Sequence, residues 1–182
     1  MKEWTDQSRR DSFEVVVMAT TGGLMKSERV PVWISAMNPV MKGMLRAGVP
    51  MGPTILLTVR GRKTGRSHTT PVGMFERDGR RWLFAQFGAV GWVRNLRISG
   101  EATVGRGRRR EMVAAVELSA GAAAAVLHDI VAPWLKGPMG GMAGRMAGRP
   151  IFNVPLDAPV EQFIGEAARH PIFEVTTQGV AR

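Results

Sequence analysis

The chain contains no cysteine and only three histidines. The lack of cysteine excludes disulfides, zinc thiolates, iron–sulfur clusters and a cysteine nucleophile. Because the histidines (His68, His128 and His170) lie far apart in the sequence, we expect no metal site built by the protein itself. No run of apolar residues approaches the roughly 20 needed to span a membrane, so we expect a cytoplasmic protein.

Positive charge is concentrated in residues 60–110, which hold thirteen Lys and Arg against three Asp and Glu. The rest of the chain sums to zero, so the net charge of +10 belongs to this segment. Charge that served only solubility would be spread more evenly. At the head of the segment, a turn of cations and free backbone N–H groups suits a phosphate-bearing ligand. We therefore predict an anion site at Arg62, Lys63, Thr64, Gly65 and Arg66, with a solvated hairpin turn as the alternative.

Hydrophobic periodicity and glycine or proline punctuation predict one domain over residues 30–182. Residues 1–29 are interpreted as a loosely ordered arm or as leader sequence. The predicted helices cover 32–46, 91–99, about 119–131 with Ser119 as N-cap, and 159–169; the predicted strands cover 54–60, 69–77, 81–87, 102–104, 111–118 and 171–176. Pro71 lies inside the second strand and predicts an edge or bulge where the strand ladder is open. Consecutive hairpins with peripheral helices predict an α+β fold, a small antiparallel barrel.

A second candidate segment covers residues 86–97, where glycines lead the chain from a strand into a helix. The helix N-terminus near Trp92 offers unpaired N–H groups and the positive end of the helix dipole, which suit an anion or an electron-rich ring edge. Trp92 and Asn95 share one helix face, as do Arg94 and Arg97. The alternative is a packed core tryptophan with exposed arginines. Neither a P-loop nor a dinucleotide-binding glycine motif is present.

Taken together, Leu57–Val72, Asp78-Gly79-Arg80 and Trp92–Arg97 resemble the deazaflavin-dependent nitroreductase family, split β-barrels that use coenzyme F420. Asn38-Pro39-Val40 and His170–Glu174 fit the same family, so the resemblance covers roughly residues 30–176. It implies a split β-barrel and hydride transfer between C5 of the deazaflavin and a small organic substrate. The cofactor carries the reactive chemistry and the barrel orients it.

The resemblance also implies roles for individual residues. The cofactor's phosphodiester and polyglutamate tail would lie on Arg62, Lys63, Thr64 and Gly65, with Arg66 beside them. His68, where other members often carry arginine, and Pro71 would lie along the same wall, next to the ring system. The other side of the deazaflavin would be closed by Gln86, Gly88, Trp92, Arg94 and Asn95. Because the chain has no tyrosine, the tyrosine-lined substrate pockets of some members do not transfer, and the substrate stays open.

Several alternatives stay open at the level of the sequence. An FMN-binding split barrel makes similar demands on a site, and a nucleic-acid-binding barrel would stack bases on Trp82, Phe84, Phe87 and Trp92. The cluster Arg106, Arg108, Arg109 and Arg110 is interpreted as a solvated hairpin tip, with lipid or nucleic acid as alternative contacts. The helix at 33–45 would pack on the barrel or lie on a membrane surface, and a homodimer is compatible with the fold. Residues 133–150 are either a substrate lid or a surface loop, and His128 is either a proton donor or a structural residue.

Overall fold

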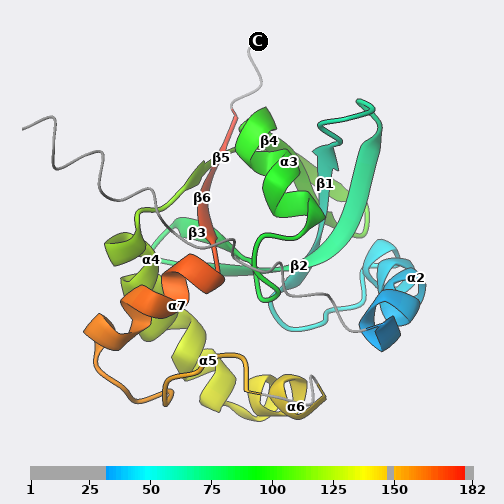
Figure 1. Ribbon diagram of the computed structural model, residues 1–182. Helices are drawn as coiled ribbons and strands as arrows, with labels where there is room; N and C mark the ends of the chain where they lie inside the picture. The colour runs from blue at the N-terminus through cyan, green and yellow to red at the C-terminus, as the bar shows by residue number, and fades with distance from the viewer. Residues whose placement is uncertain (1–31, 147–149, 179–182) are drawn as a thin grey trace, which may run out of the picture.

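The computed structural model describes residues 32–146 and 150–178 (Figure 1). The arm predicted over residues 1–29 lies outside these ranges. The helices are α2 (Val32–Arg46), α3 (Gly91–Ser99), α4 (Ala120–Val126), α5 (Ala132–Lys136), α6 (Pro138–Met146) and α7 (Phe163–Arg169). The strands are β1 (Thr54–Arg60), β2 (Ser67–Arg77), β3 (Arg80–Phe84), β4 (Glu101–Arg106), β5 (Arg109–Glu117) and β6 (Ile172–Thr177).

The six strands form a closed barrel in the order β1-β2-β3-β6-β5-β4, with β4 returning to β1. Every neighbouring pair is antiparallel. The hairpins β1–β2, β2–β3 and β4–β5 join strands that follow one another in the sequence, and β6 closes the gap between β3 and β5 (Figure 1). The predicted α+β split barrel with peripheral helices is therefore confirmed.

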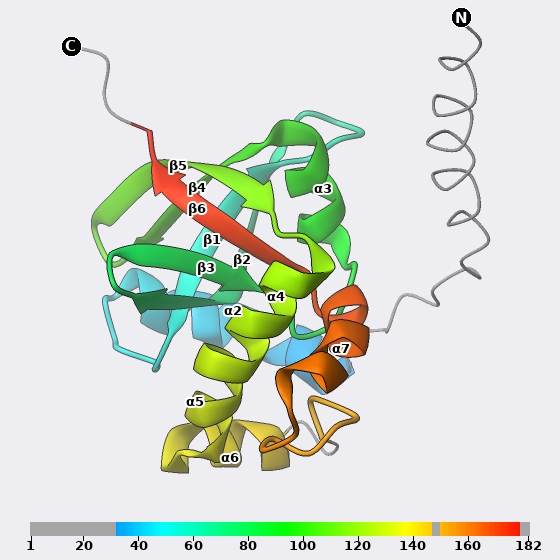
Figure 2. The ribbon, with the colours of Figure 1, turned by 90° about the vertical axis from the view of Figure 1, so that its left-hand side faces the viewer.

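The barrel interior is filled by aliphatic side chains that alternate along the strands and by one face of α3. Leu57, Leu83 and Val113 are fully buried, and Val93 and Leu96 of α3 belong to the same cluster. Figure 2 shows α3 at one end of the barrel and the β4–β5 turn at the other. One end of the barrel is therefore closed by a helix, and the other end is bounded by hairpin turns.

A second cluster fills the space between the outer face of the β2–β3 sheet and the C-terminal helices. Trp82 and Phe84 point outward from β3 and are 4% and 6% exposed, packed with Phe152 and Phe163. Both rings are enclosed by protein. Two of the four aromatic residues proposed for base stacking are therefore part of a core, which weakens the nucleic-acid alternative.

The split of the barrel lies along β2. This strand pairs with β1 from Ser67 to Gly73, whereas its pairing with β3 begins only at Gly73. Pro71 lies in the half of β2 that has one unpaired edge, so the predicted open ladder is confirmed. Beyond that edge, β3 ends at Phe84 and not at Phe87 as predicted, because Gly88 adopts a left-handed φ of 70° and its N–H closes a turn onto the Ala85 carbonyl.

The helical segment after β5 is longer than predicted. Ser119 caps α4 through its Oγ, as expected, but a π-helical turn at Leu127–Val131 carries the helix on into α5. Residues 138–146, for which a lid or surface loop was expected, form α6. The reason is packing, since Gly140 lies so close to the Trp134 carbonyl that no side chain fits there. A 3₁₀ turn at Val160–Gln162 leads into α7, so the last predicted helix is present in two parts.

Backbone contacts dock α2 on the β4–β5 hairpin. The turn consists of Gly107 and Arg108, and Gly107 has a φ of 60°. Its N–H donates to the Leu45 carbonyl over 2.8 Å, and its Cα lies against Gly48. This contact places α2 alongside β1 and β2. Within the described residues, the helices are too short or too polar to cross a membrane.

Candidate functional site

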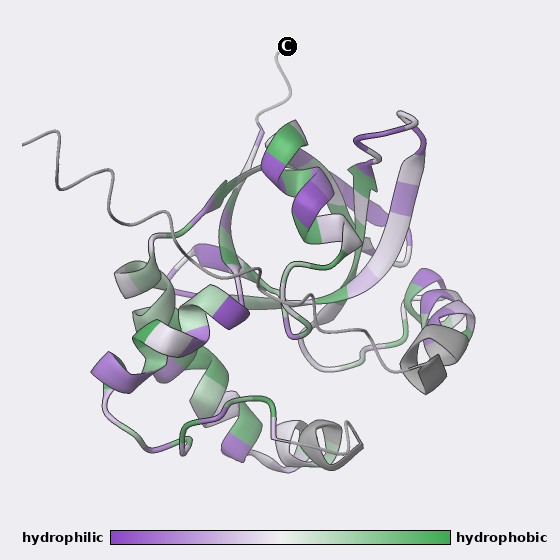
Figure 3. Ribbon diagram, viewed as in Figure 1, coloured by the Kyte–Doolittle hydropathy of each residue, from purple (hydrophilic) through white to green (hydrophobic). Residues whose placement is uncertain are grey.

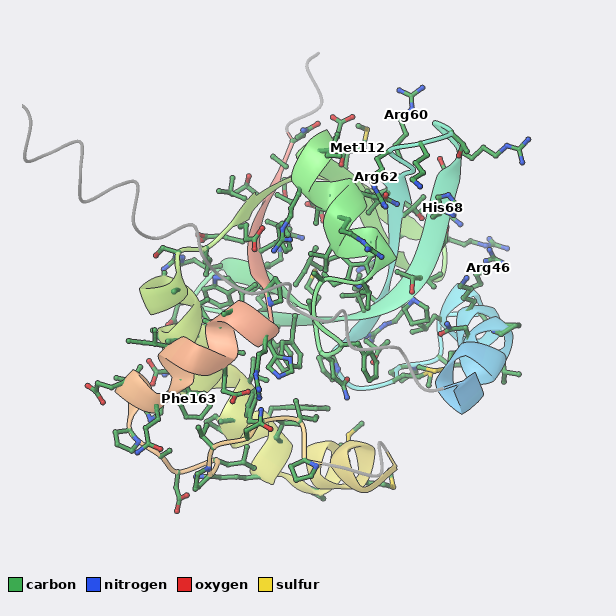
Figure 4. The ribbon with its side chains drawn as sticks, viewed as in Figure 1. Arg46, Arg60, Arg62, His68, Met112 and Phe163 are labelled. Atoms are coloured by element: carbon green, nitrogen blue, oxygen red, sulfur yellow. The ribbon has the colours of Figure 1, made fainter. Side chains whose placement is uncertain are left out.

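A cavity of about 770 Å³ opens between the β1–β2 turn, the unpaired edge of β2 and the start of α3. Figure 4 shows Arg60, Arg62 and His68 gathered around this turn. The predicted site residues that line the cavity are Arg62, Lys63, Thr64, Arg66, His68, Pro71, Trp92, Arg94 and Asn95. Two segments separated in the sequence by the whole of β3 therefore meet at one cavity, as the sequence interpretation required.

The β1–β2 turn is held in a compact shape by its own backbone. The Gly61 N–H donates to the Arg66 carbonyl and the Gly65 N–H donates to the Gly61 carbonyl, each over 2.8 Å. Gly65 has a φ of 69°, which favours glycine. A Cβ on Gly61 would lie 2.8 Å from the His68 ring and 2.9 Å from the Arg66 carbonyl oxygen. Both glycines are therefore needed for the shape that presents the cations.

Asn95 connects this turn to α3. Its Oδ1 accepts hydrogen bonds from Arg62 Nη1 over 2.9 Å and from the Arg62 backbone N–H over 3.4 Å. Asn95 is 7% exposed, so its side chain is fixed by the surrounding core. In this arrangement the oxygen of Asn95 orients Arg62, and direct contact of Asn95 with a ligand stays a prediction.

The positive charge at this cavity is not neutralised by nearby carboxylates. Within the described residues, no carboxylate forms an ion pair with Arg62, Lys63, Arg66 or Arg94. Figure 3 shows strongly hydrophilic residues over the β1–β2 turn. Val90, the N-cap of α3, forms no side-chain hydrogen bond to the helix, and it lines the cavity together with Gly91 and Trp92, so the positive end of the helix faces the cavity. The cavity can therefore accept several negative charges on one ligand.

The opposite part of the cavity is apolar and partly aromatic. Phe87 and Val90 lie in the turn before α3, and Trp92 lies in its first turn, with its ring 5.9 Å from the Phe173 ring. Pro71 faces them from the unpaired edge of β2. A planar ring system would bury apolar surface between these groups, while a charged chain attached to it would reach the cations.

The sequence did not predict several of the residues that line the cavity, and three of the residues that it did predict do not line it. Asn38, Gly61, Thr69, Thr70, Phe87, Val90 and Gly91 also line it. Gly65 shapes the turn without facing the cavity, and Gly88 is packed against the Arg169 carbonyl. Gln86 lies in the same segment and is not among the lining residues. Thr69 and Thr70 adjoin Pro71 on the open edge of β2. The proline, which predicted this open edge, was the sequence signal that could have identified them.

Two other sequence candidates lie away from this cavity. His128 bonds Asp129 through its Nδ1 and packs edge-on against Phe163, which agrees with the structural interpretation. In the described part of α5 and α6, no residue lines the cavity. Met139 and Met142 are 53% and 54% exposed on α6. The structure therefore gives the lid hypothesis no support.

The chain was compared with known families and structures. Residues 34–136 match a family model described as F420H2-dependent quinone reductase. The F420-H2 dependent reductase FDR-A is 20% identical, with 68% of this chain and 94% of that chain covered and a TM-score of 0.37. A conserved hypothetical protein from Mycobacterium tuberculosis is 15% identical, with 87% and 86% covered and a TM-score of 0.43. No curated protein shows a significant match.

The residues present fit the cofactor of that family. F420 carries a phosphodiester, a chain of glutamate carboxylates and a planar deazaflavin, and the cavity offers an apolar wall next to cations that have no ion-pair partner in the part of the chain that the structure describes. The matched segment covers more than half of the chain and contains five of the six strands together with α3. The chain therefore belongs to the F420H2-dependent quinone reductase family, and coenzyme F420 is its cofactor.

Proposed function

We propose that this F420-dependent oxidoreductase reduces a small organic acceptor of the quinone class at the cavity between the β1–β2 turn and α3. The observation that carries the proposal is that one cavity joins an apolar wall to four cations that form no ion pair within the described residues. The family supports reduction with F420H2. A flat, apolar acceptor with polar edges would stack on the exposed face of the ring system, the face away from Phe87 and Trp92.

The cations would hold the anionic tail of the cofactor. In the proposal, Arg62, Lys63 and Arg66 bind the phosphodiester and the carboxylates, each contact contributing about 1.5–3 kcal/mol when it is well formed. Asn95 would keep Arg62 in place, because its buried oxygen accepts two hydrogen bonds from that residue. The tail contacts would fix the position of the ring relative to the acceptor, which is the orientation that hydride transfer requires.

The ring system would lie against the apolar wall. Bound F420H2 supplies the hydride, and the residues of the chain exclude water from one face of the ring and align the acceptor on the other. Since His128 lies elsewhere, the accompanying proton comes from solvent in this proposal. The proposed hydride transfer needs no nucleophile from the protein, in keeping with the lack of cysteine.

The test is a fluorescence titration with oxidised F420 and, in parallel, with FMN, on the wild type, Lys63→Ala and Lys136→Ala. Lys136 is the matched control because it is exposed on α5 and lines neither this cavity nor any other that we describe. We expect F420 to bind, Lys63→Ala to weaken binding at least about tenfold, and Lys136→Ala to change it less than twofold. Equal effects of the two substitutions would show that the tail lies elsewhere.

Turnover tests the acceptor class separately. F420H2 oxidation is followed with menadione as the quinone and with no acceptor as the blank. We expect quinone-dependent oxidation that Lys63→Ala slows at low cofactor concentration and that excess cofactor restores. Tight F420 binding without menadione reduction would support the proposed cofactor site and contradict the proposed quinone acceptor. Binding of FMN alone would contradict both the cofactor site and the acceptor.

A further inference from the structure

A second cavity, of about 640 Å³, lies at the barrel end opposite α3, where the β4–β5 turn is located (Figure 2). It is lined by Gly48, Ile55, Met74, Arg81, Val104, Gly105, Arg106, Arg109, Arg110 and Glu111. We call it the barrel-mouth cavity. It shares no residue with the cofactor cavity. It is lined by Arg106, Arg109 and Arg110, to which the proposed function assigns no role.

The floor of the barrel-mouth cavity is formed by hydrophobic side chains that also belong to the interior core of the barrel. Ile55 and Val104 are 6% and 3% exposed and belong to the interior cluster that includes Leu57 and Val113. Met74 packs against the same cluster and is only partly buried. Of the three, Met74 therefore offers the exposed apolar surface that an entering group would cover, whereas Ile55 and Val104 offer little.

Arg81 and Glu111 neutralise one another at the side of the cavity. Arg81 donates two hydrogen bonds of 2.8 Å to the two oxygens of Glu111, and Thr177 donates to the same carboxylate. The hydrogen bonds from Arg81 and Thr177 lower the pKa of Glu111 to about 2. This pair therefore adds no net charge at neutral pH.

The other three arginines leave the rim positive. Arg106 Nη2 donates to the carbonyls of Gly52 and Thr54 over 2.9 and 2.7 Å, which fixes the guanidinium without neutralising it. Its buried Nε has no hydrogen-bond partner within the described residues. Arg109 and Arg110 are exposed and form no ion pair with the described carboxylates. The interpretation of this cluster as a solvated tip is therefore wrong for Arg106, because the backbone at the start of β1 binds it.

We propose that the barrel-mouth cavity binds a small amphipathic anion, with its apolar body on Met74 at the Ile55 and Val104 floor and a carboxylate or similar head group on Arg109, which alternation along β5 places on the same face as Glu111. The floor requires an apolar body and the rim requires a negative head group. Inorganic phosphate would leave the floor uncovered. The cavity volume is within the range of small-molecule sites.

The test uses decanoate as the probe and the full-length protein labelled with ¹³C at its methionine methyl groups. Met74 lines the cavity, so its methyl resonance reports occupancy at the site itself, and Met74→Leu assigns it. Met139 and Met142, exposed on α6, serve as internal controls for nonspecific binding. We expect a saturable shift of the Met74 methyl with decanoate, little shift with decan-1-ol or inorganic phosphate, and none at Met139 or Met142.

Substitutions on the hairpin make the assignment specific. Arg109 is exposed, so Arg109→Gln should fold, and it is expected to weaken decanoate binding about tenfold. Arg108→Gln, on the same turn but outside the cavity, is the matched control and should change it less than twofold. Equal effects of Arg108→Gln and Arg109→Gln, an equal shift with decan-1-ol, or no saturable shift at Met74 would overturn the proposal.

Saturating F420 separates this site from the cofactor cavity. The Met74 shift with decanoate should still be inducible in its presence, and F420 binding should be unchanged in Arg109→Gln. Loss of the shift on F420 addition would place decanoate in the cofactor cavity and overturn the proposal. Failure of F420 to bind at all would leave this result intact, because no residue is shared between the two cavities.

Discussion

Eight of the thirteen Lys and Arg residues of 60–110 line the two cavities, four at each, but the two cavities use this charge differently. At the cofactor cavity, Arg62, Lys63 and Arg66 lie on one tight turn and face no carboxylate partner among the described residues. At the barrel-mouth cavity, one of four arginines is fully paired and another is fixed by backbone carbonyls. Whether a site can bind an anion therefore depends less on the net charge of its sequence segment than on whether each cation already has a partner.

The order of strands explains this difference. Among the described residues, the carboxylates that hydrogen-bond to arginines of β3 and α3 come from β5 (Glu111 and Glu117) and β6 (Glu174), whereas Arg77 of β2 pairs with Asp78 of the β2–β3 turn, at the other end of β2 from the β1–β2 turn. In the barrel, β1 and β2 have β4 and β3 as their outer neighbours, so β5 and β6 adjoin neither strand. The β1–β2 turn is therefore distant from these acidic residues, whereas Arg81 of β3 and the β4–β5 hairpin lie next to them. The cofactor cavity keeps its charge because of where its turn lies in the barrel.

The largest expected effect follows from substituting one of the two glycines that line the cofactor cavity. Gly61→Ala would place a Cβ 2.9 Å from the Arg66 carbonyl oxygen, whereas a Cβ on Gly91 meets nothing within 4 Å. We expect Gly61→Ala to lower the free energy of unfolding by about 1–3 kcal/mol and to abolish measurable F420 binding. Gly91→Ala should retain both. Urea denaturation and the F420 titration measure these quantities, and equal behaviour of the two variants would contradict the role of the turn.

An intermediate effect is expected at the residue that joins the turn to α3. Asn95→Ala removes the acceptor for Arg62 Nη1 and for the Arg62 N–H, so Arg62 becomes mobile. We expect F420 binding to weaken about tenfold, with about 1–2 kcal/mol lost from the free energy of unfolding. Decanoate binding at the barrel mouth should be unchanged. A loss of decanoate binding as well would indicate general unfolding of the barrel and not a local effect.

The smallest effect concerns acid stability at the barrel mouth. The pKa of Glu111 is lowered from 4.5 to about 2, chiefly by the hydrogen bond from Arg81. A lowered carboxyl pKa contributes stability that is complete above pH 4.5 and is lost as the pH falls toward 2. Because this side chain is 35% exposed, solvent screening limits the contribution to about 1 kcal/mol or less.

The measurement is the free energy of unfolding as a function of pH for the wild type, Glu111→Gln and Glu101→Gln. Glu101 is exposed, and its carboxylate forms no ion pair within the described residues. We expect the wild type and Glu101→Gln to lose stability in parallel below about pH 4.5, and Glu111→Gln to lose less. Three parallel curves would show that the Arg81–Glu111 pair contributes nothing to the barrel mouth.

Local signals in the sequence predicted most of the fold. Alternation and glycine or proline punctuation gave β1 and α3 with the observed bounds, and Ser119 gave the start of α4. The errors lie where tertiary packing overrides local pattern. Residues 85–87 continue an apolar run, yet the left-handed Gly88 ends the strand, and the glycines of α6 are accommodated by close packing on α5.

The candidate site was predicted less completely than the fold. The cations at 62–66 and the Trp92–Asn95 pair could be found because their chemistry is visible in short segments. Asn38 reaches the cavity from α2, and its position depends on how that helix docks, which no local pattern encodes. The prediction that Arg106 is solvated was wrong. Its position at the β4–β5 hairpin can be read from the sequence, but the two backbone carbonyls that it binds, those of Gly52 and Thr54, belong to a segment far away in the sequence.

The docking of α2 through Gly107 has a consequence for hydrogen exchange. An amide in a two-residue hairpin turn normally exchanges quickly with solvent, but here the Gly107 N–H is bonded to the carbonyl of Leu45. Its exchange therefore requires the helix to lift from the barrel. The protection of this single amide would give the free energy of that opening, and hence the fraction of time during which Asn38 is absent from the wall of the cofactor cavity.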